Sequence, residues 1–416
     1  MEKILKMENV NKIKDKEQKK ALNAWAKAGF CGSVIAGTGF GKSRIAVLAI
    51  DHILKQNSRS NNKAALILVP TIQLQAQFVD EFDKWNVDSS KVDIMCYQTA
   101  YKLTGHHYDI VVCDEIHLGL SEEYRKFFKN NIYDSLLCMT ATLPEEEEYK
   151  NILMKIAPVI YKISLDECVS LGIVAPYIIE CVPVKLTITE QAEYKHVNNT
   201  FVKWKYALGH FDAFDNAKSI IKNSNASPQD KKAAALFYKA IRERKAIVDF
   251  AANKIVEFQK LVLSNLNKKI LVFSGANKFT DDLCKAAFPL ALAYHSGKTK
   301  KQKETALQKF RDNEINVLCS TKALNQGLDV PDANMGIICG ITSKSLSMIQ
   351  RVGRLLRFQE GKIGKIIILY VKDSQEEKWL KQSVKDLKII ITNFFILINY
   401  ENRYRFRNVK ANRHIC

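Results

Sequence analysis

The sequence lacks both a hydrophobic run long enough to cross a bilayer and any C-x-x-C pair. Its most apolar stretch, Ile389 to Tyr400, is interrupted by Thr392 and Asn393, and a spanning helix needs about 20 apolar residues. The N-terminal segment mixes Lys and Glu without an apolar core, so it carries no recognisable secretory signal. These absences predict a soluble cytoplasmic or otherwise intracellular protein, and they favour reduced, buried cysteines over the alternatives of disulfides or a zinc site.

Acidic residues are also scarce relative to basic ones. The 416 residues include 63 Lys and Arg against 44 Asp and Glu, which gives a formal net charge of +19. This excess favours binding to the phosphate backbone of nucleic acids, with attraction to an anionic membrane surface as the alternative. The chain is too long for one ordinary core, so we expect two or three domains.

Short apolar runs alternate with amphipathic helical stretches in two separate segments, which is typical of parallel α/β sheets. A long helical segment with one break, at 223–228, lies between them, and no short repeat or low-complexity tract is present. The fold class is therefore α/β, with two tandem parallel-sheet domains and a helical insertion. The expected strands include Ser33–Ile35, Ala64–Val69, Asp109–Cys113 and Ser135–Met139, then Lys269–Phe273, Asn316–Cys319, Met335–Cys339 and Ile366–Val371.

A glycine-rich loop follows the first expected strand and precedes a helix. Its sequence is Ala36-Gly37-Thr38-Gly39-Phe40-Gly41-Lys42-Ser43. Small residues let the backbone wrap the phosphates of ATP, Lys42 would reach the β and γ phosphates, and the Ser43 hydroxyl would ligate Mg²⁺. Ala36 replaces the first glycine of the general motif, and a chance glycine-rich turn is the alternative.

Two acids end another expected strand. Asp114-Glu115-Ile116-His117 follows an apolar run, at the strand end where ligands of open α/β sheets gather. Asp114 would hold Mg²⁺ through its water shell, and Glu115 would orient and deprotonate the attacking water. An Asp-Glu pair in a surface turn is the alternative, which the preceding phosphate loop makes harder to sustain.

With these two motifs the chain resembles superfamily 2 helicases of the DExH type, from about Asp15 to Val371. The other motifs of that superfamily follow in the expected order. They are Gln18 upstream of the loop, Val69-Pro70-Thr71, Tyr97-Gln98-Thr99, Thr140-Ala141-Thr142, Val272-Phe273-Ser274, Ser320-Thr321 through Gly327-Leu328-Asp329, and Gln350-Arg351-Val352-Gly353-Arg354-Leu355-Leu356-Arg357. The resemblance implies two RecA-like domains at 1–165 and 266–385, a linker with the helical insertion at 166–265, and a tail at 386–416.

The resemblance also implies residue roles. Gln18 would read adenine, Asp329 would contact the ribose, and Gln350 would sense the γ phosphate. Arg354 and Arg357 would face the γ phosphate across the gap between the lobes, and His117 would join Glu115 among the catalytic residues. The nucleic-acid contacts would be Thr71, Gln98, Thr99 and Thr321, whose small polar side chains suit phosphates rather than bases.

Sequence around the motifs resembles the xeroderma pigmentosum group B-like branch, with its phage UvsW-type and restriction-subunit relatives. The matching segments are Ile156–Tyr161, Leu165–Glu167 and Gly172–Tyr177. Glu145-Glu146-Glu147 replaces the Arg-Glu-Asp element of that branch. We expect no N-terminal damage-recognition domain, because Lys42 comes early.

The predicted function is an ATP-dependent DNA helicase or translocase acting in repair, recombination or replication. An RNA helicase, a restriction-system motor and a non-catalytic nucleic-acid-binding protein with a decayed ATP site are the alternatives. In the insertion, Phe201-Val202-Lys203-Trp204-Lys205-Tyr206 resembles a base-stacking platform, but an amphipathic helix that buries Phe201 and Trp204 is favoured. For the basic, aromatic tail Arg403–Arg407 a solvated end is favoured.

Overall fold

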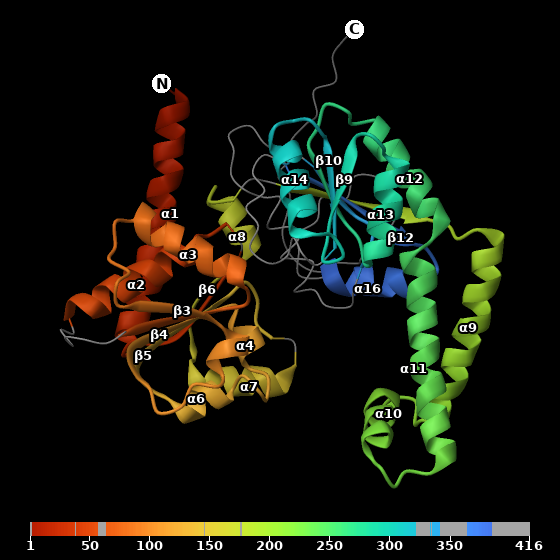
Figure 1. The fold of residues 1–416 in the computed structure, drawn as a ribbon, viewed down its shortest axis with the longest axis horizontal. Coiled ribbons are helices and arrows are strands. Elements are labelled where there is room, and N and C mark those ends of the chain that lie inside the picture. The colour runs from red at the N-terminus through yellow and green to blue at the C-terminus, as the bar shows by residue number, and fades with distance from the viewer. Residues whose placement is uncertain are drawn as a thin grey trace, which may run out of the picture.

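The computed structural model describes residues 2–37, 39–56, 64–144, 146–174, 177–321, 333, 335–341 and 364–384. These residues form two α/β lobes and a helical arm (Figure 1). No helix in the described ranges combines the length and apolar character that crossing a membrane requires.

The first lobe is built on a six-stranded parallel sheet in the order β3-β2-β4-β5-β1-β6. Its strands are β1 Cys31–Ala36, β2 Ala65–Val69, β3 Val92–Cys96, β4 His107–Asp114, β5 Ile132–Thr140 and β6 Val159–Ile163. Successive side chains of β2 alternate between two cores, since Ile67 packs in one cluster and Leu66 and Leu68 in the other. Continuous apolar strands therefore occupy the middle of a sheet that is covered on both faces.

Helices cover both faces of this sheet. They are α1 Glu2–Lys27, α2 Lys42–Gln56, α3 Ile72–Lys84, α4 Tyr97–Ala100, α5 Ile116–Gly119, α6 Lys126–Asn130, α7 Glu147–Ile156 and α8 Leu165–Ser170. The apolar stripe of α2, which includes Ile45, Ala49 and Ile53, is buried. The indole of Trp25 on α1 donates to the Leu136 carbonyl at 2.9 Å, which fixes α1 against β5.

The second lobe repeats this architecture with a six-stranded parallel sheet in the order β7-β12-β11-β8-β10-β9. Its strands are β7 Tyr177–Val184, β8 Ile270–Phe273, β9 Ala291–Tyr294, β10 Val317–Ser320, β11 Met335–Ile338 and β12 Gly364–Val371. Its helices are α12 Ala252–Leu263, α13 Asn277–Ala286, α14 Lys300–Arg311 and α16 Gln375–Val384. The fold class predicted from the sequence is thus confirmed.

All eight apolar runs predicted as strands are strands, and the four strands that were not predicted are β3, β6, β7 and β9. These four are the edge strands of the two sheets. An edge strand has one neighbour and tolerates polar residues and proline, as Glu180 and Pro183 in β7 illustrate. β7 falls within 166–265, which the sequence assigned to a linker and helical insertion, yet it pairs with β12 along its whole length.

Between β7 and α12 the helical arm, residues 188–249, projects from the second lobe (Figure 1). It consists of α9 Ile188–Ala207, α10 Ala213–Lys222 and α11 Pro228–Asp249, so the predicted break at 223–228 lies between two helices. The Phe201 ring stacks on Phe237 with centroids 5.4 Å apart, and Trp204 packs against the same core. The favoured amphipathic helix is confirmed for these two residues, whereas Tyr206 is 64% exposed.

Candidate nucleotide site and nucleic-acid interface

The glycine-rich loop connects the buried strand β1 to the N-terminus of α2, as the sequence predicted. Gly39 and Gly41 have φ values of +88° and +89°, which L side chains rarely adopt. A Cβ at Gly41 would also lie 2.4 Å from the Gln18 amide nitrogen. Lys42 Nζ donates to the Ala36 carbonyl at 3.0 Å, so the ammonium folds back over the loop where phosphates would bind. Thr38 lies outside the described residues.

Side chains of α1 and α2 brace this loop. Gln18 Nε2 donates to the Phe40 carbonyl at 2.7 Å, and its Oε1 accepts from Arg44 at 2.6 Å. Arg44 also donates to Asp15 at 2.6 Å and lies 4.2 Å from the Trp85 ring centroid. Both ends of the Gln18 amide are therefore engaged, while its oxygen keeps a second lone pair that could accept from an adenine amino group. The bracing role of Arg44 was missed because its partners are distant in sequence.

Phe40 and the segment after β6 complete the surroundings of the loop. The Phe40 side chain is fully buried and stacks on Tyr161 with centroids 6.0 Å apart. A Cβ at Gly37 would lie 3.5 Å from Leu165, and one at Gly39 would lie 3.1 Å from Val174. The distance at Gly37 is an ordinary van der Waals contact, whereas a side chain at Gly39 would press against Val174.

Asp114 ends β4, which is separated from β1 by β5 alone. Burial, with a smaller contribution from the adjacent Glu115, raises the pKa of its carboxyl to about 7, and the Lys42 charge opposes this rise. The Tyr97 hydroxyl donates to the Asp114 carbonyl at 2.8 Å, which fixes the strand end. Asp114 is therefore a buried acid that a cation would stabilise in its charged form.

Glu115 is held in place by side chains of neighbouring elements. Its backbone is left-handed, with φ +49°. The Thr140 hydroxyl at the end of β5 donates to Glu115 Oε2 at 3.2 Å, and His117 Nδ1 lies 3.4 Å from the same oxygen and 3.2 Å from that hydroxyl. Thr140 and His117 thus orient the carboxylate of Glu115. The sequence indicated all three residues but not this connection.

The donor set next to the loop fits Mg²⁺. No cluster of three or more His, Cys, Asp or Glu with metal-binding geometry exists among the residues the structure describes. A nucleotide-bound Mg²⁺ does not require one, since it takes one or two protein oxygens and completes its shell with phosphates and water. The buried Asp114 carboxyl and the Ser43 hydroxyl, which follows Lys42 on α2, are ligands of the required kind.

The predicted nucleic-acid residues of the first lobe follow two adjacent strands. Thr71 comes directly after β2 and precedes α3, while Gln98 and Thr99 follow β3 on the short helix α4. Gln98 Nε2 donates to the Pro70 carbonyl at 3.4 Å, so the two loops are in contact. Gln98 and Thr99 are exposed, which leaves this edge accessible to a phosphate backbone.

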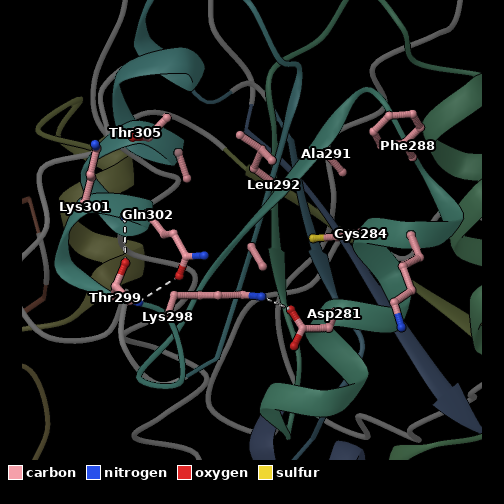
Figure 2. A pocket seen from close by; sticks show the side chains of 13 residues that line it. Asp281, Cys284, Phe288, Ala291, Leu292, Lys298, Thr299, Lys301, Gln302 and Thr305 are labelled. Carbon is pink, nitrogen blue, oxygen red and sulfur yellow. Dashed lines mark hydrogen bonds and ion pairs between the residues drawn. The ribbon is translucent and has the colours of Figure 1, made fainter.

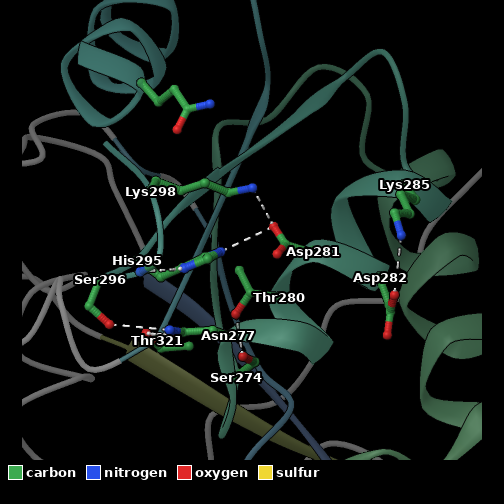
Figure 3. Close-up of polar contacts among 12 residues, drawn as sticks. Ser274, Asn277, Thr280, Asp281, Asp282, Lys285, His295, Ser296, Lys298 and Thr321 are labelled. Carbon is green, nitrogen blue, oxygen red and sulfur yellow. Dashed lines mark hydrogen bonds and ion pairs between the residues drawn. The ribbon is translucent and has the colours of Figure 1, made fainter. Parts of the chain in front are cut away.

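In the second lobe Thr321 belongs to a polar cluster at the carboxyl ends of β8, β9 and β10 (Figure 3). The Thr321 hydroxyl donates to Asn277 Oδ1 at 3.0 Å, and Asn277 Nδ2 donates to the Ser296 hydroxyl at 3.2 Å. Gly297 N donates to His295 Nδ1 at 3.1 Å, so Nε2 carries the proton and faces Asp281 at 3.1 Å. Asn277 and His295 were not predicted, because no local pattern marks them.

The remaining predicted site residues lie outside the described residues. They are Asp329, Gln350, Arg354 and Arg357. Their roles stay predictions.

A lysine-bearing phosphate loop, two acids at a nearby strand end and a second similar sheet define a P-loop ATPase with tandem RecA-like domains. Family models agree, since residues 12–145 match the type III restriction enzyme res subunit and residues 253–359 match the helicase conserved C-terminal domain. The chain belongs to the superfamily 2 helicases of the XPB and restriction-subunit type, and is an ATP-driven enzyme of that class.

The chain is also similar to several individual proteins. The DNA 3'-5' translocase XPB2 of Sulfurisphaera tokodaii is 28% identical over 83% of this chain and 80% of its own length. The pre-mRNA-splicing ATP-dependent RNA helicase PRP28 of Cryptococcus neoformans is 32% identical, over 30% of this chain and 16% of its own. The Hef helicase domain of Pyrococcus furiosus aligns in structure with a TM-score of 0.49 and 17% identity, over 86% of this chain and 96% of that one.

Proposed function

We propose that the chain is an ATP-dependent DNA translocase or helicase that remodels or unwinds DNA in repair, recombination or replication. The observation that carries this proposal is the placement of Lys42, Asp114 and Glu115 at the carboxyl ends of two strands of one sheet. DNA is favoured because the relative that matches 83% of the chain is named a DNA 3'-5' translocase. The net charge of +19 supports binding of a polyanion.

In this mechanism the loop amides and Lys42 hold the triphosphate. Glu115, oriented by Thr140 and His117, accepts a proton from the attacking water. Mg²⁺ held by Asp114 and Ser43 would neutralise charge on the phosphates. Arg354 and Arg357 would approach the γ phosphate from the second lobe when DNA draws the lobes together, which couples hydrolysis to movement.

On the nucleic-acid side, Thr71, Gln98, Thr99 and Thr321 would contact successive phosphates without reading bases. The helical arm offers a further surface, since Phe211 near its end is 88% exposed. Its ring lies 4.4 Å from His210, which in turn lies 4.5 Å from Tyr206. Exposed aromatic rings of this kind can stack on unpaired bases.

ATP turnover tests the proposal. We expect single-stranded or forked DNA to raise turnover strongly, and Lys42→Ala or Arg357→Ala to abolish the stimulated rate, with a loss of at least about 10³-fold. Lys55→Ala, at the exposed far end of α2, is the matched control and should behave as wild type. Turnover that is independent of any polynucleotide would contradict the proposal.

An RNA helicase is the second candidate, because PRP28 matches 30% of the chain. Contacts to phosphates do not distinguish the two sugars. Matched DNA and RNA strands in the same assay decide between them, and stronger stimulation by RNA would overturn the choice of DNA. Displacement of a roadblock from the 5′ end of a DNA strand would extend the 3′ to 5′ direction of the XPB2 relative to this chain.

A further inference from the structure

β9 forms one edge of the second sheet, and among the described residues no strand pairs with its outer side. Val317 N donates to the Leu290 carbonyl at 3.0 Å. Because backbone groups alternate along a parallel strand, Leu290, Leu292 and Tyr294 point toward β10. Ala291 and Ala293 therefore direct their N–H and C=O groups outward, which is the arrangement that an added strand requires.

A groove of about 660 Å³ runs along this edge. Figure 2 shows Ala291 and Leu292 of β9 between Cys284 of α13 on one side and Thr305 of α14 on the other. Of the strand residues, Leu292 and Ala293 are partly exposed, whereas Ala291 is only 3% exposed. Phe288, at the entrance to the strand, is 82% exposed.

The groove carries an excess of positive charge. Lys285, Lys298 and Lys301 line it against one acid, Asp281. The Asp281 carboxylate is already engaged, because Lys298 lies 2.9 Å and His295 3.1 Å from it. Lys285 is 80% exposed and lies 3.7 Å from Asp282, which is a weak surface ion pair. The groove therefore matches a segment of opposite charge.

We propose that this groove binds an extended acidic segment of a partner protein, which adds to β9 as a further strand. Backbone hydrogen bonds to Ala291 and Ala293 would hold the segment, its acidic side chains would meet Lys285 and Lys301, and an apolar side chain would contact Leu292. The site lies along the outer edge of the second sheet.

The positive charge of the groove argues against the chain's own C-terminal segment and a second copy of the chain as occupants, and hydrogen bonding argues against a nucleic acid. The C-terminal segment of this chain carries Arg403, Arg405 and Arg407, so the lysines would repel it. A second copy with a net charge of +19 is disfavoured for the same reason. A nucleic acid would satisfy the lysines but would leave the outward carbonyl groups of Ala291 and Ala293 without donors, since its phosphates are acceptors only.

Selection from a phage-displayed library of random peptides against the full-length protein tests the proposal. We expect enriched peptides in which acidic and β-branched or aromatic residues alternate. Their affinity should fall by about tenfold or more for Ala293→Pro, which removes an outward N–H without removing a bond to β10. Lys301→Glu should reduce it similarly, while Ala293→Ser retains the N–H and should bind as wild type.

The outcomes are distinguishable. Unchanged DNA-stimulated ATP turnover and melting temperature in Ala293→Pro would show that the variant is folded. Failure to enrich acidic peptides, or equal binding to Ala293→Pro and wild type, would overturn the proposal. Loss of DNA affinity in Lys301→Glu but not in Ala293→Pro would assign the groove to nucleic acid. Dimerisation that Ala293→Pro abolishes would assign it to a second copy.

Discussion

Each lobe has a buried acid near the carboxyl ends of its parallel strands, and the two acids differ in what surrounds them. Glu376 in the second lobe and its partner Lys254 are both fully buried, 2.7 Å apart. Glu376 also accepts from Val371 N at 2.8 Å, and Lys254 donates to the Cys339 carbonyl at 2.8 Å. Asp114 in the first lobe has no ion pair with a described residue at such a distance, and Lys42 affects it only electrostatically.

Burial raises the pKa of both carboxyls, to about 7 for Asp114, whereas Lys254 directly opposes the rise at Glu376. The charge of Glu376 is satisfied within the protein, so this pair holds α12, β12 and α16 together. The carboxylate of Asp114 has no such partner among the described residues, so a cation could still bind to it. A buried acid near the carboxyl ends of parallel strands is therefore paired within the protein in the second lobe, whereas in the first lobe it is a candidate for binding a cation.

The largest expected effect comes from removing the charge of Asp114. Asp114→Asn should lower DNA-stimulated ATP turnover by at least about 10³-fold, because the amide cannot replace a carboxylate next to Mg²⁺ and phosphate. Its melting temperature should not fall. Steady-state turnover and thermal unfolding measure the two effects, with Asp51→Asn on the surface of α2 as the control. A variant that loses stability together with activity would show that Asp114 is structural.

Removing one partner of the Lys254–Glu376 pair should lower stability, unlike the loss of the Asp114 charge. Lys254→Met leaves Glu376 buried without its cation and should cost about 3 to 5 kcal/mol of unfolding free energy. Lys254→Met with Glu376→Leu should recover much of that loss, because no unpaired charge remains. Denaturant unfolding measures both, and Lys260→Met, on the exposed side of α12, should lie within about 0.5 kcal/mol of wild type. Equal losses in the single and double variants would contradict this interpretation.

The pH dependence of stability provides a third contrast. The unfolded Asp114 carboxyl ionises near its ordinary value of 3.8, and the folded one near 7. Folding therefore takes up a proton between these pH values, so the burial of Asp114 becomes increasingly destabilising as pH rises through that window. Asp114→Asn should melt close to wild type at pH 4 and above it at pH 8, without Mg²⁺ or nucleotide. An advantage of the same size at both pH values would contradict the raised pKa.

This contrast also marks what the sequence could predict. Asp114 and Glu115 were identified because they are adjacent and follow an apolar run. Lys254 and Glu376 are 122 positions apart, and no local pattern connects them. The same limit applies to the strands, since the central ones are continuous apolar runs and the edge strands β3, β6, β7 and β9 are not. Motifs made of neighbouring residues could therefore be predicted from the sequence, whereas contacts between distant segments could be identified only in the folded structure.

The bracing of the phosphate loop follows the same rule. Gln18 was singled out for a role toward adenine, but its bonds to Phe40 and Arg44 join segments whose proximity only the fold establishes. A glutamine next to a glycine-rich loop can serve the ligand, the loop or both. In this structure Gln18 bonds to Arg44 as well as to the loop, and nothing in the local sequence identifies that arginine as its partner.

The smallest expected effect concerns the hydroxyl that orients Glu115 beside Asp114. Thr140→Val keeps the shape of the side chain but removes the 3.2 Å hydrogen bond to Glu115, and a bond to a charged group contributes about 1.5 to 3 kcal/mol. We expect the maximal DNA-stimulated turnover rate to fall by roughly tenfold or somewhat more, a factor of 10 for every ~1.4 kcal/mol, with little change in the KM for ATP. Thr140→Ser retains the hydroxyl and should restore most of the rate. A raised KM with an unchanged maximal rate would instead mean that Thr140 supports nucleotide binding, and that the Glu115 carboxylate is oriented by His117 alone.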